Sequence, residues 1–104
     1  MTGGPIKFDL ARFAAAVRDY APRWERAAIR WQFTFGPGFD KSAAWVTCET
    51  HDRAVQLIIW TSGEAELVSG SVATDMDNVH YDLVAPADLG TCLDDLTQRI
   101  IERS

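Results

Sequence analysis

Two cysteines and two histidines are the side chains in this sequence with the greatest potential for covalent chemistry. Cys48 precedes His51 by three residues, and His80 is the other imidazole. A thiol beside an imidazole is the arrangement of a cysteine nucleophile and its general base. Cys48, however, falls in the middle of a predicted strand, and no glycine-rich turn adjoins it to form an oxyanion site. We therefore predict that these residues form no catalytic site and that the protein is not an enzyme.

Acidic and imidazole side chains raise the separate question of a metal site. The segment from Asp75 to Asn78 begins like a calcium loop but lacks the next Asp, the glycine and the distant bidentate Glu. His51, Asp52 and His80 have neither HxH nor HExxH spacing. Residues 36–38, Gly-Pro-Gly, are not followed by the Lys-Ser/Thr pair of a phosphate loop. We expect neither a metal nor a cofactor.

The length and composition predict one domain over residues 1–104, with residues 1–7 as a tail. The chain has 104 residues and an apolar fraction of 47%, which is ordinary for a globular protein. No apolar run approaches the roughly 18 residues of a membrane span, and the first residues lack the pattern of a secretory signal. Cys48 and Cys92 are far apart and are expected to be reduced and buried, with a disulfide between one strand and one helix as the alternative. We expect a soluble, cytoplasmic protein.

Charge is distributed unevenly along the chain. Residues 1–48 hold seven Lys/Arg against four Asp/Glu, whereas residues 49–104 hold three Arg against eleven Asp/Glu. An acidic half repels nucleic acid backbones and attracts a basic protein. The distribution therefore argues against nucleic acid binding and favours a basic protein partner, with simple solubility as the alternative interpretation.

Residues 54–67 predict a β-hairpin at the centre of the chain. Six of the first seven residues are apolar and three are β-branched, as in a strand rather than a helix. Ser62 and Gly63 are expected to form a two-residue turn in which the glycine takes a positive φ. One face of this hairpin then carries the predicted core residues Ile58, Trp60, Ala65 and Leu67. The opposite face mixes aliphatic and acidic side chains, namely Leu57, Ile59, Thr61, Glu64 and Glu66.

The first helix is predicted over residues 10–28, where apolar side chains recur at three- and four-residue steps. Asp9 is expected to cap this helix, and Pro22 to kink it near residues 19–21 or split it. The last helix is predicted to begin at Pro86, with Asp88 near its positive end. Its expected buried stripe is Leu89, Cys92, Leu93, Leu96 and Ile100.

Further strands are predicted over residues 29–35, 43–50 and 79–85, with Asp75 to Asn78 as the turn before the last. Gly70 is expected to mark a bulge or a close approach in the return strand of the hairpin. Short connections imply an antiparallel meander. The predicted fold is therefore α+β, a two-layer sandwich in which a meander sheet of four to five strands packs against N-terminal and C-terminal helices.

The mixed face of the hairpin is the predicted site for binding a protein. Trp45 has the opposite parity from Val46 and Cys48, so one of these two sets faces outward, and an exposed Trp is typical of interface hot spots. The alternative is that Trp45 packs under a helix. The full set of predicted protein-binding residues is Leu57, Ile59, Glu64, Glu66, Asp75, Asp77, Asp82 and Trp45.

The segment Ile59-Trp-Thr-Ser-Gly-Glu-Ala-Glu-Leu67 resembles the central hairpin of the TriTu family of immunity proteins from bacterial polymorphic toxin systems. The layout is similar as well, with a leading helix, a sheet and a closing helix opened by Pro86-Ala-Asp-Leu89. The resemblance implies a non-catalytic protein that binds a cognate toxin and blocks its active site or a required surface. It assigns no individual residue to toxin contact.

Two other functional classes remain open from the sequence. One is a small-ligand-binding or enzymatic domain with a pocket between sheet and helices. The other is a secretion chaperone or adaptor, which binds an unfolded or N-terminal export segment rather than a folded toxin. An exposed edge strand would also allow a homodimer.

Overall fold

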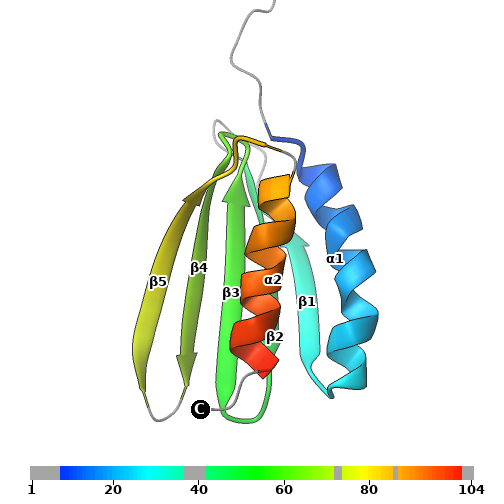
Figure 1. The fold of residues 1–104 in the computed structure, drawn as a ribbon, viewed down its shortest axis with the longest axis vertical. Coiled ribbons are helices and arrows are strands. Elements are labelled where there is room, and N and C mark those ends of the chain that lie inside the picture. Colours follow the sequence, from blue (N-terminus) through cyan, green and yellow to red (C-terminus); the bar gives the residue numbers. More distant parts are fainter. Residues whose placement is uncertain (1–7, 37–41, 72–73, 86, 102–104) are drawn as a thin grey trace, which may run out of the picture.

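The computed structural model describes residues 8–36, 42–71, 74–85 and 87–101. Its elements follow in the order α1 (Leu10–Arg26), β1 (Arg30–Phe35), β2 (Ala43–Glu49), β3 (Arg53–Trp60), β4 (Glu64–Ser71), β5 (Thr74–Asp82) and α2 (Ala87–Ile101). Each strand pairs antiparallel with the next, so the sheet order is β1-β2-β3-β4-β5. Both helices lie on the same side of the sheet (Figure 1). The predicted α+β meander is confirmed, with five strands.

The first helix begins and ends with satisfied backbone groups. At its start, the Asp9 carboxylate accepts a hydrogen bond from the Ala11 N–H at 2.9 Å, as predicted. At its end, the N–H groups of Ala28 and Ile29 donate to the carbonyls of Glu25 and Trp24 at 3.0 and 2.9 Å. This is the Schellman pattern, which uses a left-handed residue, here Ala28 with φ 62°. The helix is therefore shorter than the predicted range of 10–28.

Pro22 does not split this helix, which runs through it as one element of 17 residues. Proline removes one N–H donor from the helix. The surrounding residues Val17, Ala21 and Trp24 are all buried against the rest of the core. Since most helix stability in proteins comes from packing of the apolar face, burial on both sides of Pro22 outweighs the lost bond.

The central hairpin has a three-residue loop rather than the predicted two-residue turn. Gly63 has the predicted positive φ, 94°, and its N–H donates to the Trp60 carbonyl at 2.9 Å. The pairing consequently places Ile59 opposite Ala65 and Leu57 opposite Leu67. A shift of one residue in register exchanges the two faces of one strand relative to the other. The predicted core face, with Ile58 and Trp60, is therefore wrong for β3.

The turn before β5 also lies earlier than predicted. Asp75 to Asn78 belong to β5, because Ser71 already pairs with Thr74 at the end of the hairpin. The register of β4 against β5 shifts between Ser69 and Ser71, which confirms the predicted irregularity at Gly70. Along the rest of β5, Val79 and Tyr81 are half-buried while His80 and Asp82 are exposed, in agreement with the predicted alternation.

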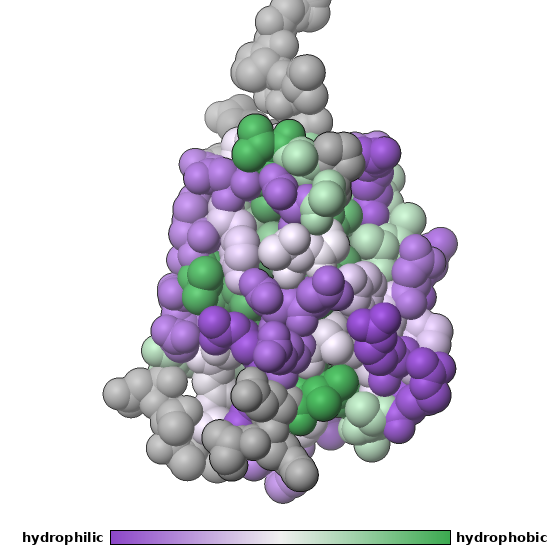
Figure 2. All heavy atoms as spheres, in the orientation of Figure 1, coloured by the Kyte–Doolittle hydropathy of each residue, from purple (hydrophilic) through white to green (hydrophobic). Residues whose placement is uncertain are grey.

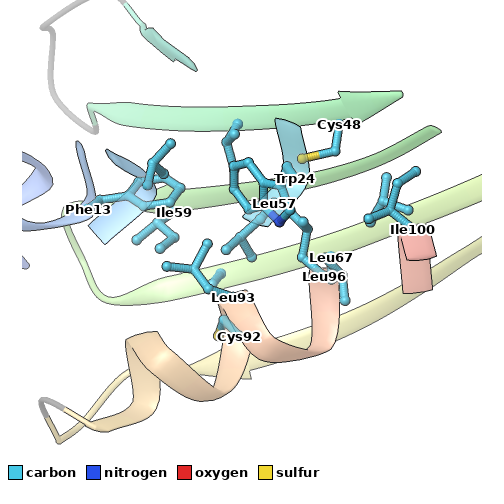
Figure 3. Packing of buried hydrophobic residues seen from close by; sticks show 14 of the residues in the cluster. Phe13, Trp24, Cys48, Leu57, Ile59, Leu67, Cys92, Leu93, Leu96 and Ile100 are labelled. Carbon is cyan, nitrogen blue, oxygen red and sulfur yellow. The ribbon is translucent and has the colours of Figure 1, made fainter. Parts of the chain in front are cut away.

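The core lies between the two helices and one face of the sheet (Figure 3). Leu93 and Leu96 of α2 pack toward Leu57 and Leu67 of the sheet, all fully or almost fully buried. The predicted stripe of α2 is confirmed: Cys92, Leu93, Leu96 and Ile100 are buried, and Leu89 packs at the margin. Pro86 lies outside the described residues.

Candidate protein-binding surface

The sheet has a second face that neither helix covers, and we call it the open face. Side chains alternate between the two sides of a strand. Ala44, Val46 and Cys48 are buried beneath the helices, so Trp45 and Thr47 point to the other side. The same alternation and the strand pairing place further side chains of β3, β4 and β5 on this side. The open face on β2 to β5 includes Trp45, Thr47, Gln56, Ile58, Trp60, Glu64, Glu66, Val68, Asn78, His80 and Asp82.

The centre of the open face is apolar. Trp45 and Ile58 are direct cross-strand partners, and Trp60 follows two residues along β3 on the same side. All three side chains are half-buried although no helix lies over them. The Trp45 ring lies close over Gly36, where a Cβ atom would come within 2.9 Å of it. Aromatic and aliphatic side chains gathered in this way on a sheet surface are typical of the centre of a protein interface.

Carboxylates lie beside this centre on β4 and β5. Glu66 stands opposite Ile58 on one side and His80 on the other, and Glu64 stands opposite Asp82. Neighbouring groups hold two of the acids: Asn78 donates to Glu66 at 3.2 Å, and the His80 Nε2 atom lies 3.2 Å from an Asp82 oxygen. Across the described positions of β3, β4 and β5, the open face carries no Lys or Arg.

The β1–β2 side of the open face differs in charge from the β4–β5 side. Arg30 of β1 lies 3.2 Å from Glu49 of β2, and both side chains are largely exposed. This ion pair neutralises the β1 side, whereas Glu64, Glu66 and Asp82 leave the β4–β5 side negative. The open face therefore presents an apolar centre with an acidic rim along one side only.

The structure brings together four of the eight predicted binding residues, Trp45, Glu64, Glu66 and Asp82, on this open face. Asp77 lies on the helix side of β5 and forms an ion pair with Arg99 of α2 at 3.2 Å. Asp75 belongs to β5, but its side chain lies outside the part of the chain that is described.

The placement of Leu57 and Ile59 on an exposed face is wrong. Both are 0% exposed in the core, because the three-residue loop gives them the buried parity. The open face instead receives Ile58 and Trp60, which the sequence prediction assigned to the core. Gln56 could have identified this face from the sequence alone. It is the one polar residue in the apolar run 54–60, and it lies on the same side of the strand as Ile58 and Trp60.

The thiols do not take part in this surface. Cys48 and Cys92 are free, and both are 0% exposed. Burial raises the pKa of each thiol to about 12, so both are protonated at neutral pH and are poor nucleophiles. Within the described residues, no three His, Cys, Asp or Glu side chains gather closely enough to hold a metal ion.

Two hollows lie at the end of the molecule where the helices finish. The larger, about 1060 Å³, is bordered by the ends of both helices and the β2–β3 turn; Arg53 beside it donates to the Arg99 carbonyl at 2.7 Å. The smaller, about 430 Å³, lies on the open-face side between Ala54, Val68 and Met76. Both are open, and His51 and Asp52 are exposed where they border them. Neither hollow has the enclosed, convergent polar groups of a ligand site.

The helix side of the molecule faces away from the open face. Its surface is dominated by hydrophilic residues (Figure 2). The described helices include none that is both long and apolar enough to cross a membrane.

Comparison of the chain with protein-family models, with curated proteins and with solved structures gave no match.

Proposed function

We propose that this protein is a non-catalytic immunity protein, which binds a cognate bacterial toxin in the cytoplasm of the producing cell and covers its active site or a required surface. The observation that carries the proposal is the open face, with an apolar centre at Trp45, Ile58 and Trp60 and an acidic rim at Glu64 and Glu66. The resemblance of the hairpin over residues 59–67 to the TriTu family adds the toxin as the partner. Three residues of that hairpin, Trp60, Glu64 and Glu66, lie on the open face.

The two parts of the open face have different roles in this proposal. Tryptophan and isoleucine provide the area that is removed from water, which is where most binding energy arises. The carboxylates accelerate the approach of a basic partner and align it, because charge complementarity acts mainly on association rate and specificity. A nuclease toxin fits this chemistry, since its basic surface meets carboxylates where it would otherwise meet phosphates.

The first experiment is recovery of the partner from the native host with tagged protein, followed by co-expression of the two. The proposal expects one toxic protein to be recovered, with binding that weakens as salt rises, and growth to be restored by co-expression. Recovery of an unfolded or N-terminal export segment would instead support the secretion chaperone. A small metabolite that co-purifies without any protein would support the ligand-binding alternative.

Charge reversal of the acidic rim is the sharper test. We expect Glu66→Lys to weaken toxin binding at least tenfold and to abolish growth protection, because Glu66 adjoins the apolar centre. Asp19→Lys is the matched control, since Asp19 is an exposed acid on α1, on the other side of the sheet. Circular dichroism would establish that both variants are folded. Unchanged affinity and protection in Glu66→Lys would refute binding through this face.

A further inference from the structure

The outer edge of β5 offers backbone hydrogen bonds that no described strand uses. β5 is the last strand of the sheet, and only β4 pairs with it. The Leu83 N–H donates to the Gly63 carbonyl at 2.8 Å, that is, toward β4. Backbone groups alternate in direction along an antiparallel strand, so those of residues 77, 79 and 81 also point toward β4. Those of residues 78, 80 and 82 therefore point away from the sheet.

The same alternation holds across the rest of the sheet. The Thr61 N–H donates to the Ser42 carbonyl, the Thr50 N–H to the Arg53 carbonyl and the Gly36 N–H to the Ala43 carbonyl. Each of these pairs continues the register of its two strands, and together they fix which residues of every strand face each neighbour. The outward direction of these β5 backbone groups therefore agrees with the hydrogen-bond pattern of the whole sheet.

This edge lacks several of the devices that usually prevent strand addition. Natural edge strands are protected by Pro, Lys, bulges or a covering element. β5 spans nine residues and contains neither Pro nor Lys, and the irregularity at Ser69 and Ser71 lies at its start. α2 lies over β3 rather than beyond β5, so the outer side of β5 is the margin of the sheet (Figure 1).

The charge of the edge selects what can add to it. Asp82 on β5 and Glu64 and Glu66 on β4 give this side of the open face three carboxylates and no Lys or Arg, whereas Asp77 on the helix side is already paired with Arg99. A second copy pairing through β5 would bring acidic strands together, and like charges across a strand pair are destabilising. A segment that bears Lys or Arg would place opposite charges there instead.

We propose that β5 accepts an extended, basic segment of a partner protein as a sixth strand of the sheet. Its side chains would alternate between the two faces of the sheet, with the basic ones on the open face beside Asp82. The segment gains affinity from main-chain hydrogen bonds and selectivity from its charge. The proposal does not depend on the partner being a toxin, because it concerns the backbone edge rather than the apolar centre of the open face.

The test uses a defined probe, a nine-residue end-blocked peptide of alternating Lys and Val, and a matched peptide with an N-methyl group on every residue, so that neither of its edges carries an N–H. Both peptides carry the same charge, but the methylated one cannot complete the ladder. We expect the plain peptide to slow amide exchange at Asn78 and His80 and to bind at least tenfold more tightly than the methylated peptide. Equal binding of the two peptides, or no binding of either, would overturn the proposal and leave the carboxylates as protection against aggregation.

Variants of the protein separate the backbone from the side chain. The Asn78 N–H points away from β4, so Asn78→Pro removes it without breaking a bond within the sheet. Asn78→Ala keeps that N–H and removes the same side chain. We expect Asn78→Ala to retain the peptide and Asn78→Pro to lose it at least tenfold. Loss in both variants, or in neither, contradicts strand addition. Should Asn78→Pro fail to fold by circular dichroism, the pair His80→Pro and His80→Ala makes the same comparison.

Discussion

Ala28 holds a backbone conformation that an L-amino acid with a side chain rarely adopts. Its φ of 62° is the only positive value at a non-glycine position among the described residues. Left-handed backbone costs roughly 1–2 kcal/mol for such a residue because Cβ crowds the following carbonyl. The conformation persists because it lets the Ile29 N–H reach the Trp24 carbonyl at a helix end where both of these side chains are buried.

Replacing Ala28 with Gly should therefore stabilise the protein. The gain from relieved strain exceeds the added chain entropy of glycine in the unfolded state, and we expect a net increase of about 1 kcal/mol in the free energy of unfolding. Urea denaturation followed by tryptophan fluorescence measures this difference. Ala27→Gly is the control, because Ala27 has φ −93° and no strain to relieve. A loss of stability in Ala28→Gly comparable to that in Ala27→Gly would contradict the account of this helix end.

At the level of elements, the two helices are joined by a buried hydrogen-bond chain. The Trp24 indole N–H of α1 donates to the Thr97 hydroxyl of α2 at 2.9 Å, and that hydroxyl donates to the Leu93 carbonyl at 2.8 Å. Both side chains are buried, so water does not replace a lost partner. The bond fixes how α1 and α2 lie relative to each other over the sheet.

We expect Thr97→Val to destabilise the protein by about 1–3 kcal/mol, because it leaves the buried indole N–H without an acceptor at nearly unchanged volume. Thr97→Ser keeps the hydroxyl and loses only a methyl group, so its loss should be smaller. Thermal unfolding by circular dichroism ranks the three proteins. If Thr97→Val unfolds at the temperature of the unchanged protein, the bond does not stabilise the helix pair.

The helices could be predicted more completely than the strands, for a physical reason. A helix has one buried stripe and chemical signals at its start, such as Asp9, so its buried face follows directly from the sequence. In residues 54–60, the odd-numbered and the even-numbered residues are both mainly apolar. Only the number of residues in the loop before Glu64 decides which of the two sets is buried. That number depends on backbone geometry at Gly63, which the sequence leaves open between two and three residues.

The sequence likewise predicted only part of the candidate surface. Charge and alternation identified Trp45, Glu64, Glu66 and Asp82, which do lie together on the open face. The β3 part of the apolar centre, Ile58 and Trp60, required the correct register of β3 and therefore escaped prediction. The position of Asp77 on the helix side likewise depended on where the turn before β5 falls.

For the whole molecule, two hydrogen bonds link the stability of the fold to alkaline pH. The Tyr20 hydroxyl donates to Asp94, and the Tyr81 hydroxyl to Asp95, each at 2.6 Å. Burial and the nearby carboxylate raise the pKa of Tyr20 to about 12, and the same causes raise the pKa of Tyr81 further. The folded protein thus binds these protons more tightly than the unfolded chain, where tyrosine has a pKa of about 10.

This stabilisation is fully present below about pH 10 and is lost as the pH rises toward the pKa of the folded state. We expect the free energy of unfolding to fall between about pH 10 and 12, and the fall to be shallower in Tyr20→Phe. Denaturant titrations at closely spaced pH values measure both slopes. The two thiols with raised pKa values also titrate there, so the difference between the two proteins isolates Tyr20. An identical pH profile in Tyr20→Phe would refute the coupling.

The meander order of the strands has a consequence for folding during synthesis. Every strand pairs with its neighbour in the chain, so the five strands can assemble as they leave the ribosome, before residues 87–101 are made. At that stage, the nascent sheet carries apolar rows on both sides, with Leu57 and Ile59 on one and Ile58 and Trp60 on the other. Docking of α2 then completes the interior on the side of Leu57 and Ile59. A chain interrupted before α2 would leave both rows exposed, making it a strong substrate for chaperones.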